Sequence, residues 1–132
     1  MTAEPRSEGV ASRLSAYPVA ETIRRIEETA RSKGLTVFAR VDHGAGARDV
    51  GLTMQEEQVI IFGDPHAGTP LMVVRPLVGL DLPLRVLVWQ DPWGRVWVSY
   101  NESAFIAQRF GLPGELEKNI AGLPALIDQA LR

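Results

Sequence analysis

Cysteine is absent from this sequence. Its absence excludes disulfide bonds, thiolate nucleophiles and metal sites built from thiolate ligands. Long hydrophobic runs are missing as well, because no apolar stretch approaches the roughly 20 residues of a membrane span. The first nine residues also lack the apolar core of a secretory signal. We therefore expect a cytoplasmic protein without a membrane partner.

Clusters of basic residues are missing too. The net charge is −2, and the 14 lysines and arginines are scattered along the chain, with Arg24 and Arg25 as the adjacent pair. Affinity for DNA or RNA depends on clustered cations that neutralise phosphates, so no nucleic-acid partner is expected. The chain also has no GxGxxG or Walker-type phosphate loop and no Gly-x-Ser-x-Gly nucleophile elbow.

What is present is an ordinary globular composition. Hydrophobic residues make up 45% of the chain and charged residues 23%, which is typical of a folded domain. A chain of this length forms one domain. We assign residues 9–132 to a single domain and residues 1–8, which are polar and aperiodic, to a disordered leader.

Apolar periodicity predicts an α+β order of elements. Alternation predicts strands, and apolar residues that recur every three or four positions predict helices. The expected strands are 10–16, 35–41, 58–62, 84–90 and 95–100, and the expected helices are 18–33, 45–50, 70–74, 102–110 and one or two after 113. The third helix is expected to have Gly68 or Thr69 as its cap and Pro70 at its first position. The result is a two-layer α+β sandwich in the order β-α-β(4)-α, with a mostly antiparallel sheet.

The last two strands form a hairpin around Asp91-Pro92-Trp93-Gly94, a sequence typical of a type I turn. Pairing of Gln90 with Arg95 would place Val88 on the side of Trp97, and Trp89 on the side of Val96 and Val98. Both faces of the hairpin are then apolar, so the sheet needs helices on both sides or a partner subunit on one. We expect a homodimer.

Asp42 and His43 lie at the end of a predicted strand. A carboxylate beside an imidazole can serve general acid–base catalysis, so His43 is a candidate catalytic residue. The alternative is structural: Asp42 would cap the short helix that follows, and His43 would bond to loop backbone. The sequence leaves both open.

A second polar group follows the buried strand 58–62. Asp64 between Gly63 and Pro65 favours a turn closed by side-chain hydrogen bonds, and Thr69 offers a hydroxyl at a helix start that could bind an anion or simply cap the helix. The spacing of the Asp42, His43, Asp64 and His66 side chains matches no metal-binding motif. We therefore predict no metal site.

A third group lies near the open end of the hairpin. Arg85 and Tyr100 are expected on one face of it, close to the turn that contains Asp81, and Asp81 could pair with Arg85. These three residues form either a structural clasp or part of a ligand site.

Three of these segments carry a family resemblance. They are Val41-Asp42-His43, Phe62-Gly63-Asp64-Pro65 and Leu80-Asp81-Leu82-Pro83. Together they resemble the family catalogued as domain of unknown function 302, whose members carry an Asp-His pair, an FGNP-like turn and a Leu-Asp-Leu-Pro turn. Asp64 stands where the family has asparagine, and Arg85 stands where it has lysine or arginine. The resemblance implies a β-α-β(4)-α fold.

Three functions are compatible with these observations. The first is small-molecule binding by a homo-oligomer, with Asp42, His43, Asp64 and Thr69 around one pocket and Asp81, Arg85 and Tyr100 as further ligand-binding residues. The second is an enzyme that uses His43 as acid or base. The third is an assembly module that docks through the apolar hairpin. No particular cofactor is indicated.

Overall fold

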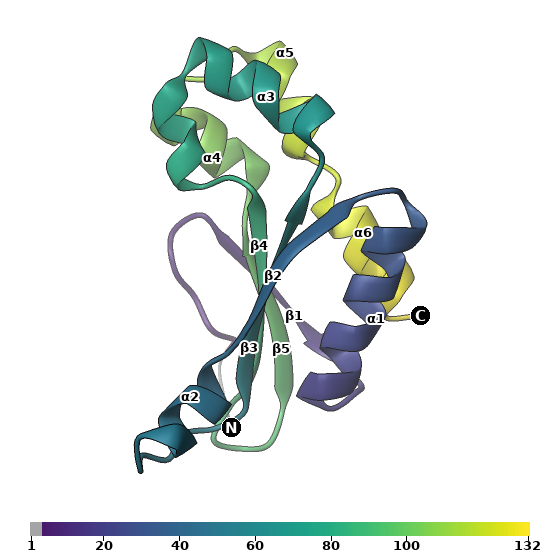
Figure 1. Ribbon diagram of the computed structural model, residues 1–132, viewed down its shortest axis with the longest axis vertical. Helices are drawn as coiled ribbons and strands as arrows, with labels where there is room; N and C mark the ends of the chain where they lie inside the picture. Colours follow the sequence, from purple (N-terminus) through teal and green to yellow (C-terminus); the bar gives the residue numbers. More distant parts are fainter. Residues whose placement is uncertain (1–3) are drawn as a thin grey trace.

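The computed structural model describes residues 4–132, and it contains one five-stranded antiparallel sheet in the order β1-β5-β4-β3-β2 (Figure 1). The strands are β1 (Val10–Ser15), β2 (Thr36–Asp42), β3 (Glu57–Gly63), β4 (Leu84–Gln90) and β5 (Val96–Asn101). The α-helices are α1 (Val19–Ser32), α2 (His43–Asp49), α3 (Pro65–Val74), α4 (Ser103–Phe110), α5 (Gly114–Glu117) and α6 (Leu123–Ala130), and the 3₁₀ turns are η1 (Pro76–Leu80) and η2 (Lys118–Ile120). The predicted α+β class, the five strands and the antiparallel sheet are confirmed.

The predicted leader, residues 1–8, falls partly outside this description, because residues 1–3 are not among the described residues. Nearer the sheet, the backbone N–H of Val10 donates to the carbonyl of Ser7 at 3.1 Å. Gly9 between them has a φ of +74°, and a Cβ there would collide with the ring of Phe105. Glycine is therefore required where the chain enters β1.

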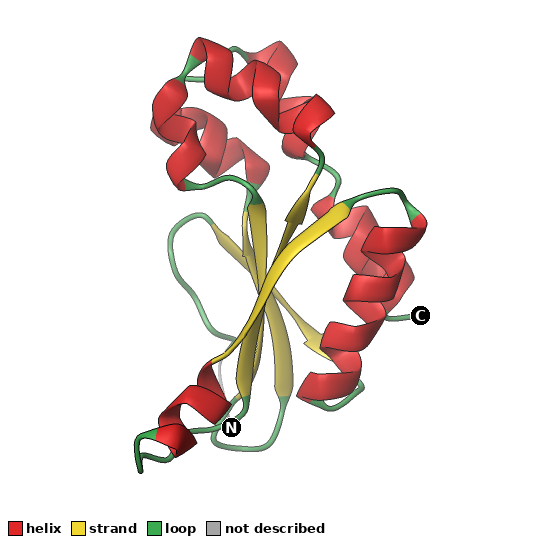
Figure 2. Cartoon of the chain, in the orientation of Figure 1, coloured by secondary structure: helices red, strands yellow, loops and turns green. Residues whose placement is uncertain are grey.

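Helix α1 covers one face of the sheet together with α6 (Figure 2). Its apolar side chains recur every three or four residues, so Ile23, Ile26 and Ala30 lie along one stripe and are completely buried. They pack against the even-numbered residues of β4 and β5, Val86 and Val98 among them. This layer of helix on sheet is the main hydrophobic core.

The register of the hairpin differs from the predicted one. Gln90 pairs with Val96, so Trp89 lies opposite Trp97 and Val88 opposite Val98. The two indole rings stack with centroids 6.4 Å apart on the face away from α1. A turn is present at the predicted position, with the N–H of Gly94 donating to the carbonyl of Asp91 at 3.0 Å. The turn residues were read correctly, but one extra residue in the loop shifted every side chain by one position.

Asp91 explains why the loop holds this register. Asp91 is 3% exposed. Its carboxylate accepts hydrogen bonds from the backbone N–H groups of Trp93 and Arg95 and from the Nε of Arg95. It also accepts from the indole Nε1 of Trp97 at 3.0 Å. Burial raises the pKa of Asp91, but these donors outweigh burial and hold the pKa at about 2.

A group of helices lies beyond one end of the sheet (Figure 2). Its elements α3, η1, α4 and η2 enclose a second hydrophobic cluster, and they are hereafter called the helical lobe. Its buried residues are Leu71, Val78, Ile106, Ala107, Leu112 and Ile120. Leu84 at the start of β4 packs against both clusters, and so joins the lobe to the sheet core.

The start of α3 is a correction. The helix begins at Pro65, not at Pro70, and its cap is Asp64, not Gly68 or Thr69; the Asp64 carboxylate accepts from the N–H of His66 at 2.9 Å. Pro70 therefore lies inside the helix. Asp64 followed by Pro65 offers the same combination of a cap and a first-turn proline one turn earlier. The longer helix is the one whose Leu71 packs in the cluster of the helical lobe.

Candidate functional site: an apolar groove between the sheet and the helical lobe

A groove with a cavity volume of about 530 Å³ lies where the helical lobe meets the sheet core. Its floor combines residues of both hydrophobic clusters, such as Phe62 and Leu126 from the sheet core and Ile120 from the lobe. Its remaining walls come from the start of β2, from α3, from the Leu82–Leu84 segment and from α6. The size falls within the range of roughly 300–1,000 Å³ that small-molecule sites occupy.

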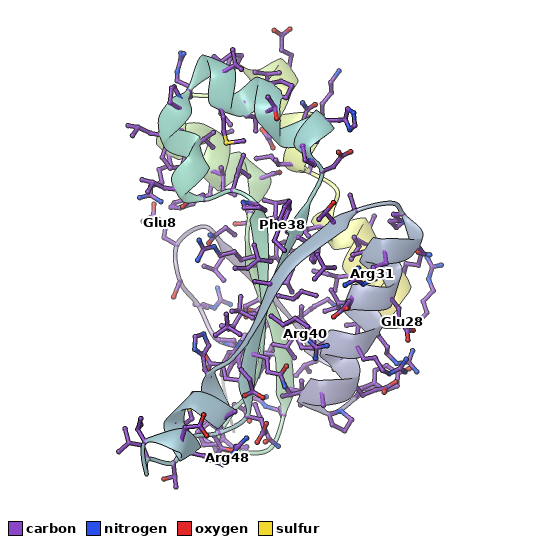
Figure 3. The ribbon with its side chains drawn as sticks, viewed as in Figure 1. Glu8, Glu28, Arg31, Phe38, Arg40 and Arg48 are labelled. Carbon is purple, nitrogen blue, oxygen red and sulfur yellow. The ribbon has the colours of Figure 1, made fainter. Side chains whose placement is uncertain are left out.

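Phe38 reaches this groove because of an irregularity in β2. The pairing with β3 shifts between Val37 and Ala39, so Phe38 is the additional residue of a bulge. Bulges re-aim side chains at the ends of sheets. Phe38 is 50% exposed, lines the groove and lies at the end of the sheet nearest the helical lobe (Figure 3).

Four polar residues line the mostly apolar groove: Lys33, Asp64, Thr69 and Asn119. The Nδ2 of Asn119 donates to the carbonyl of Ala67 at 3.1 Å and so ties the segment before α6 to α3. The Oδ1 of Asn119 and the hydroxyl of Thr69 can accept or donate to a bound molecule. A few polar groups on an apolar wall are the usual means of orienting a ligand.

Asp64 has a structural role as well as a place on the wall. Besides the His66 backbone N–H, the His66 ring nitrogen Nδ1 lies 3.0 Å from the same carboxylate oxygen. These two groups hold the pKa of Asp64 below its usual value. The predicted turn-closing role of Asp64 is confirmed, and at neutral pH its carboxylate can only accept hydrogen bonds.

Asp42 and His43 lie at the opposite end of the sheet. Asp42 pairs with Gln58 in β2 and β3, whereas the groove begins beyond the Thr36–Gly63 pair, roughly 18 Å away at the strand rise of about 3.3 Å per residue. Figure 3 shows the same separation, with Arg48 of α2 at one end and Phe38 at the other. The single pocket expected around all these loops is therefore not formed.

Within its own loop, Asp42 caps α2. Its carboxylate accepts from the N–H of Ala45 at 2.8 Å, as the structural alternative predicted. His43 is the first residue of the helix and is exposed.

The third group of predicted residues is divided between places. Asp81 pairs with Arg109 of α4 at 2.9 Å, not with Arg85. Arg85 and Tyr100 lie on opposite faces of the sheet, because Leu87 is the residue that pairs with Ser99. That expectation was wrong for the same reason as the hairpin register. Burial first, and then the negative charge of Glu102, raise the pKa of Tyr100.

Asp81 and Arg85 do share a smaller cavity of about 190 Å³ under η1. Among the predicted residues, Asp64 and Thr69 are thus the two that the fold brings together at the large groove. Its other polar residues, Lys33 and Asn119, follow α1 and α5 and carry no motif. The sequence predicts the apolar residues of α6 only as core positions, because no local pattern distinguishes a residue that lines a groove from one that lies in the core.

No cluster of three or more His, Asp or Glu side chains that could hold a metal ion occurs in residues 4–132. None of the helices in the same span has the length and apolar character needed to cross a membrane.

The fold and the groove define an α+β domain in which an antiparallel sheet, covered on one face by two helices, carries a helical lobe at its end. The family model described as "Domain of unknown function DUF302" matches residues 11–130. The chain belongs to this family, as the three sequence segments indicated.

A solved structure has the same architecture. The crystal structure of an uncharacterised conserved DUF302 protein from Bacillus stearothermophilus superimposes with a TM-score of 0.77 at 17% identity, over 95% of this chain and 97% of that chain. At this identity the likeness concerns the fold alone.

Two Brucella proteins are much more similar in sequence. "Fluoride-specific ion channel FluC 1" of Brucella suis biovar 1 (strain 1330) is 48% identical over 104 residues, which are 79% of this chain and 41% of that protein. The protein of the same name in Brucella abortus biovar 1 (strain 9-941) is also 48% identical over 104 residues, 38% of its length. The chain thus spans about two fifths of the curated relatives it matches.

Proposed function

We propose that this domain binds a small, mainly apolar molecule in the groove between the sheet and the helical lobe. The observation that carries the proposal is a cavity of about 530 Å³ whose floor is made by the hydrophobic residues of two separate clusters. Its polar groups are few, and three of them lie at the cap of α3, on α3 and on η2, where they can orient one polar end of the molecule. A cytoplasmic location is part of the same proposal.

The polar groups restrict the chemistry of the molecule. Asp64 accepts hydrogen bonds and carries a negative charge, whereas Asn119 and Thr69 are neutral. The cation at the groove is Lys33, at the end of α1. A molecule with an apolar body and a hydroxyl or amide end fits this arrangement better than a dianion such as a phosphate ester, which Asp64 would repel.

The groove can be blocked without disturbing either core. Ala125 of α6 lines the groove and is exposed, so a Trp side chain in Ala125→Trp can occupy the space a ligand would use. With Nile red as an uncharged apolar probe, we expect at least a tenfold rise in Kd, about 1.4 kcal/mol. The measurement is a fluorescence titration at fixed protein concentration.

The control is Ala104→Trp, which makes the same exchange at an exposed position in the first turn of another helix, α4. It adds the same apolar surface but lies outside the groove. Equal Nile red affinity in both variants would refute binding in the groove. Native mass spectrometry of protein purified from its own host would then identify a retained molecule in the wild type and its absence in Ala125→Trp.

The identity with the Brucella proteins supports a second function. We propose that the domain acts beside a fluoride channel, because 79% of this chain is 48% identical to part of two proteins named as fluoride-specific channels. The matched part is less than half of those proteins. The domain would then correspond to an accessory part of such channel proteins, and its groove would bind a molecule or segment connected with the channel.

Deletion of the gene tests this second function. A strain without this chain should stop growing at a lower sodium fluoride concentration than the wild type, and a plasmid copy should restore growth. Sodium chloride at equal concentration controls for ionic strength. Unchanged fluoride tolerance would end this proposal and would leave the groove experiment unaffected.

A further inference from the structure

Helices α1 and α6 leave the opposite face of the sheet uncovered, and on that side α2 contacts β3 only at one end of the strands (Figures 1 and 2). The strand register places Val41 of the edge strand β2 beside Val59 and Ile61 of β3 and Leu87 and Trp89 of β4, and these five residues are called the open sheet face. Val41 is 42% exposed, and the other four are partly exposed. An apolar surface of this kind marks an interaction site.

The segment that precedes β1 also lies on this side, away from α1, where Figure 3 labels Glu8. It borders the space next to Val10 and Ser12 of β1. This segment therefore flanks the edge strand β1, and the open sheet face on β2, β3 and β4 remains uncovered.

The polar groups next to the open sheet face bond to one another. The hydroxyls of Ser12 and Ser99 are 2.7 Å apart, and the indole Nε1 of Trp89 donates to the Ser99 hydroxyl at 2.9 Å. Covering this surface with apolar atoms would thus leave none of these three groups without a partner. The desolvation cost of burying these three polar groups is therefore already offset by the hydrogen bonds that they make to one another.

Two charged residues project from the same face of the central strands, one at each end. Glu57 of β3 pairs in register with Trp89, and Arg85 of β4 pairs with Ile61. Neither takes part in an ion pair among residues 4–132. Within one chain they are four residues apart along the strands, roughly 13 Å at about 3.3 Å per residue, too far to pair.

We propose that a second copy of this chain covers the open sheet face and forms a homodimer by packing sheet against sheet. The charges specify the symmetry. A two-fold axis in the interface, perpendicular to the strands and through the Val59–Leu87 pair, places the Glu57 end of one copy over the Arg85 end of the other. Arg85 then lies near both Glu57 and the Trp89 ring of the other copy, where an ion pair and a cation–π contact can form.

The open sheet face is small for a dimer interface. Its three strands of seven residues present a flat area of roughly 330 Å² at the spacings of a β-sheet, because Trp97 and Ser99 of β5 are already buried and the segment before β1 borders Val10 and Ser12. This is less than the roughly 800 Å² per partner of a standard stable interface, so the charges rather than the area identify the occupant. A second copy is the occupant that fits, because the surface carries equal and opposite charges at equal distances from its centre.

Charge reversal tests the geometry directly. In sedimentation equilibrium of the full chain, we expect the wild type to have twice the 14.5 kDa chain mass. Glu57→Arg and Arg85→Glu should each weaken the dimer about tenfold or more, because like charges then meet across the axis. The double variant Glu57→Arg/Arg85→Glu should restore affinity close to that of the wild type.

Arg31→Glu is the matched control, since it reverses an exposed charge on α1, on the other side of the sheet. Its dimer affinity should equal that of the wild type, and circular dichroism should show all four variants folded. A wild type that remains monomeric at high micromolar concentration overturns the proposal. Single reversals that leave the dimer unchanged, or a double variant no better than the singles, overturn the assigned symmetry.

Discussion

Replacing Asp91 by alanine should lower the thermal midpoint by roughly 10 °C or more, because it leaves several buried donors without an acceptor. The carboxylate serves two backbone N–H groups of the turn, the Arg95 side chain and the indole of Trp97. The indole and the Arg95 Nε share one oxygen, so Asp91→Asn would turn its NH₂ group toward donors and should also destabilise. Thermal denaturation followed by circular dichroism measures both.

The pH dependence follows from the lowered pKa of Asp91. Its folded value is about 2 against an ordinary 3.8, so the carboxylate contributes its full stabilisation above pH 4 and loses it as the pH falls toward 2. The difference in thermal midpoint between the wild type and Asp91→Ala should therefore shrink over that interval. A difference that stays constant over that interval would contradict the role assigned to Asp91.

The second large effect concerns the core under α1. Ile26→Ala removes a completely buried side chain from the contact between helix and sheet and should cost about 2–5 kcal/mol of unfolding free energy. Arg31→Ala on the same helix removes an ion pair with Glu27 at 3.0 Å, with the Arg31 side chain 58% exposed. That change should cost less than about 1 kcal/mol, because water screens exposed pairs.

Urea denaturation of both variants at one fixed protein concentration measures this contrast, since association would add to the apparent stability. The slope with urea should be unchanged in both. An Ile26→Ala variant as stable as Arg31→Ala would mean that the helix layer contributes little to the fold, contrary to the packing described above.

The fold could be predicted from the sequence where the pattern is local. The periodicity of Ile23, Ile26 and Ala30 sets α1, and the β-branched run in β3 sets a buried strand. Register could not be obtained in this way, because a single additional loop residue between Gln90 and Val96 reverses every side chain of the hairpin. The position of Arg85 relative to Tyr100 depended on that register and was wrong for this reason.

The site was less accessible to the sequence than the fold. Asp64 and Thr69 could be selected because they stand among turn residues, but Asn119 and Ala125 carry no signal in their own segments. Asn119 meets the groove because η2 lies against α3, and Ala125 meets it because α6 returns to the sheet beside α1 after the helical lobe. The Asp42–His43 pair also stands out in the sequence as a candidate site, but in the structure Asp42 caps α2 and the pair does not reach the groove.

Leu84 packs against both hydrophobic clusters, so it couples the stability of the sheet core to that of the helical lobe. The helices of the lobe have ten residues or fewer. They are too short to persist by themselves in water, and they can open as a cooperative unit of their own. A molecule in the groove would contact both units at once. It would oppose separate opening of the lobe, so occupancy of the groove and the cooperativity of unfolding are coupled quantities in this domain.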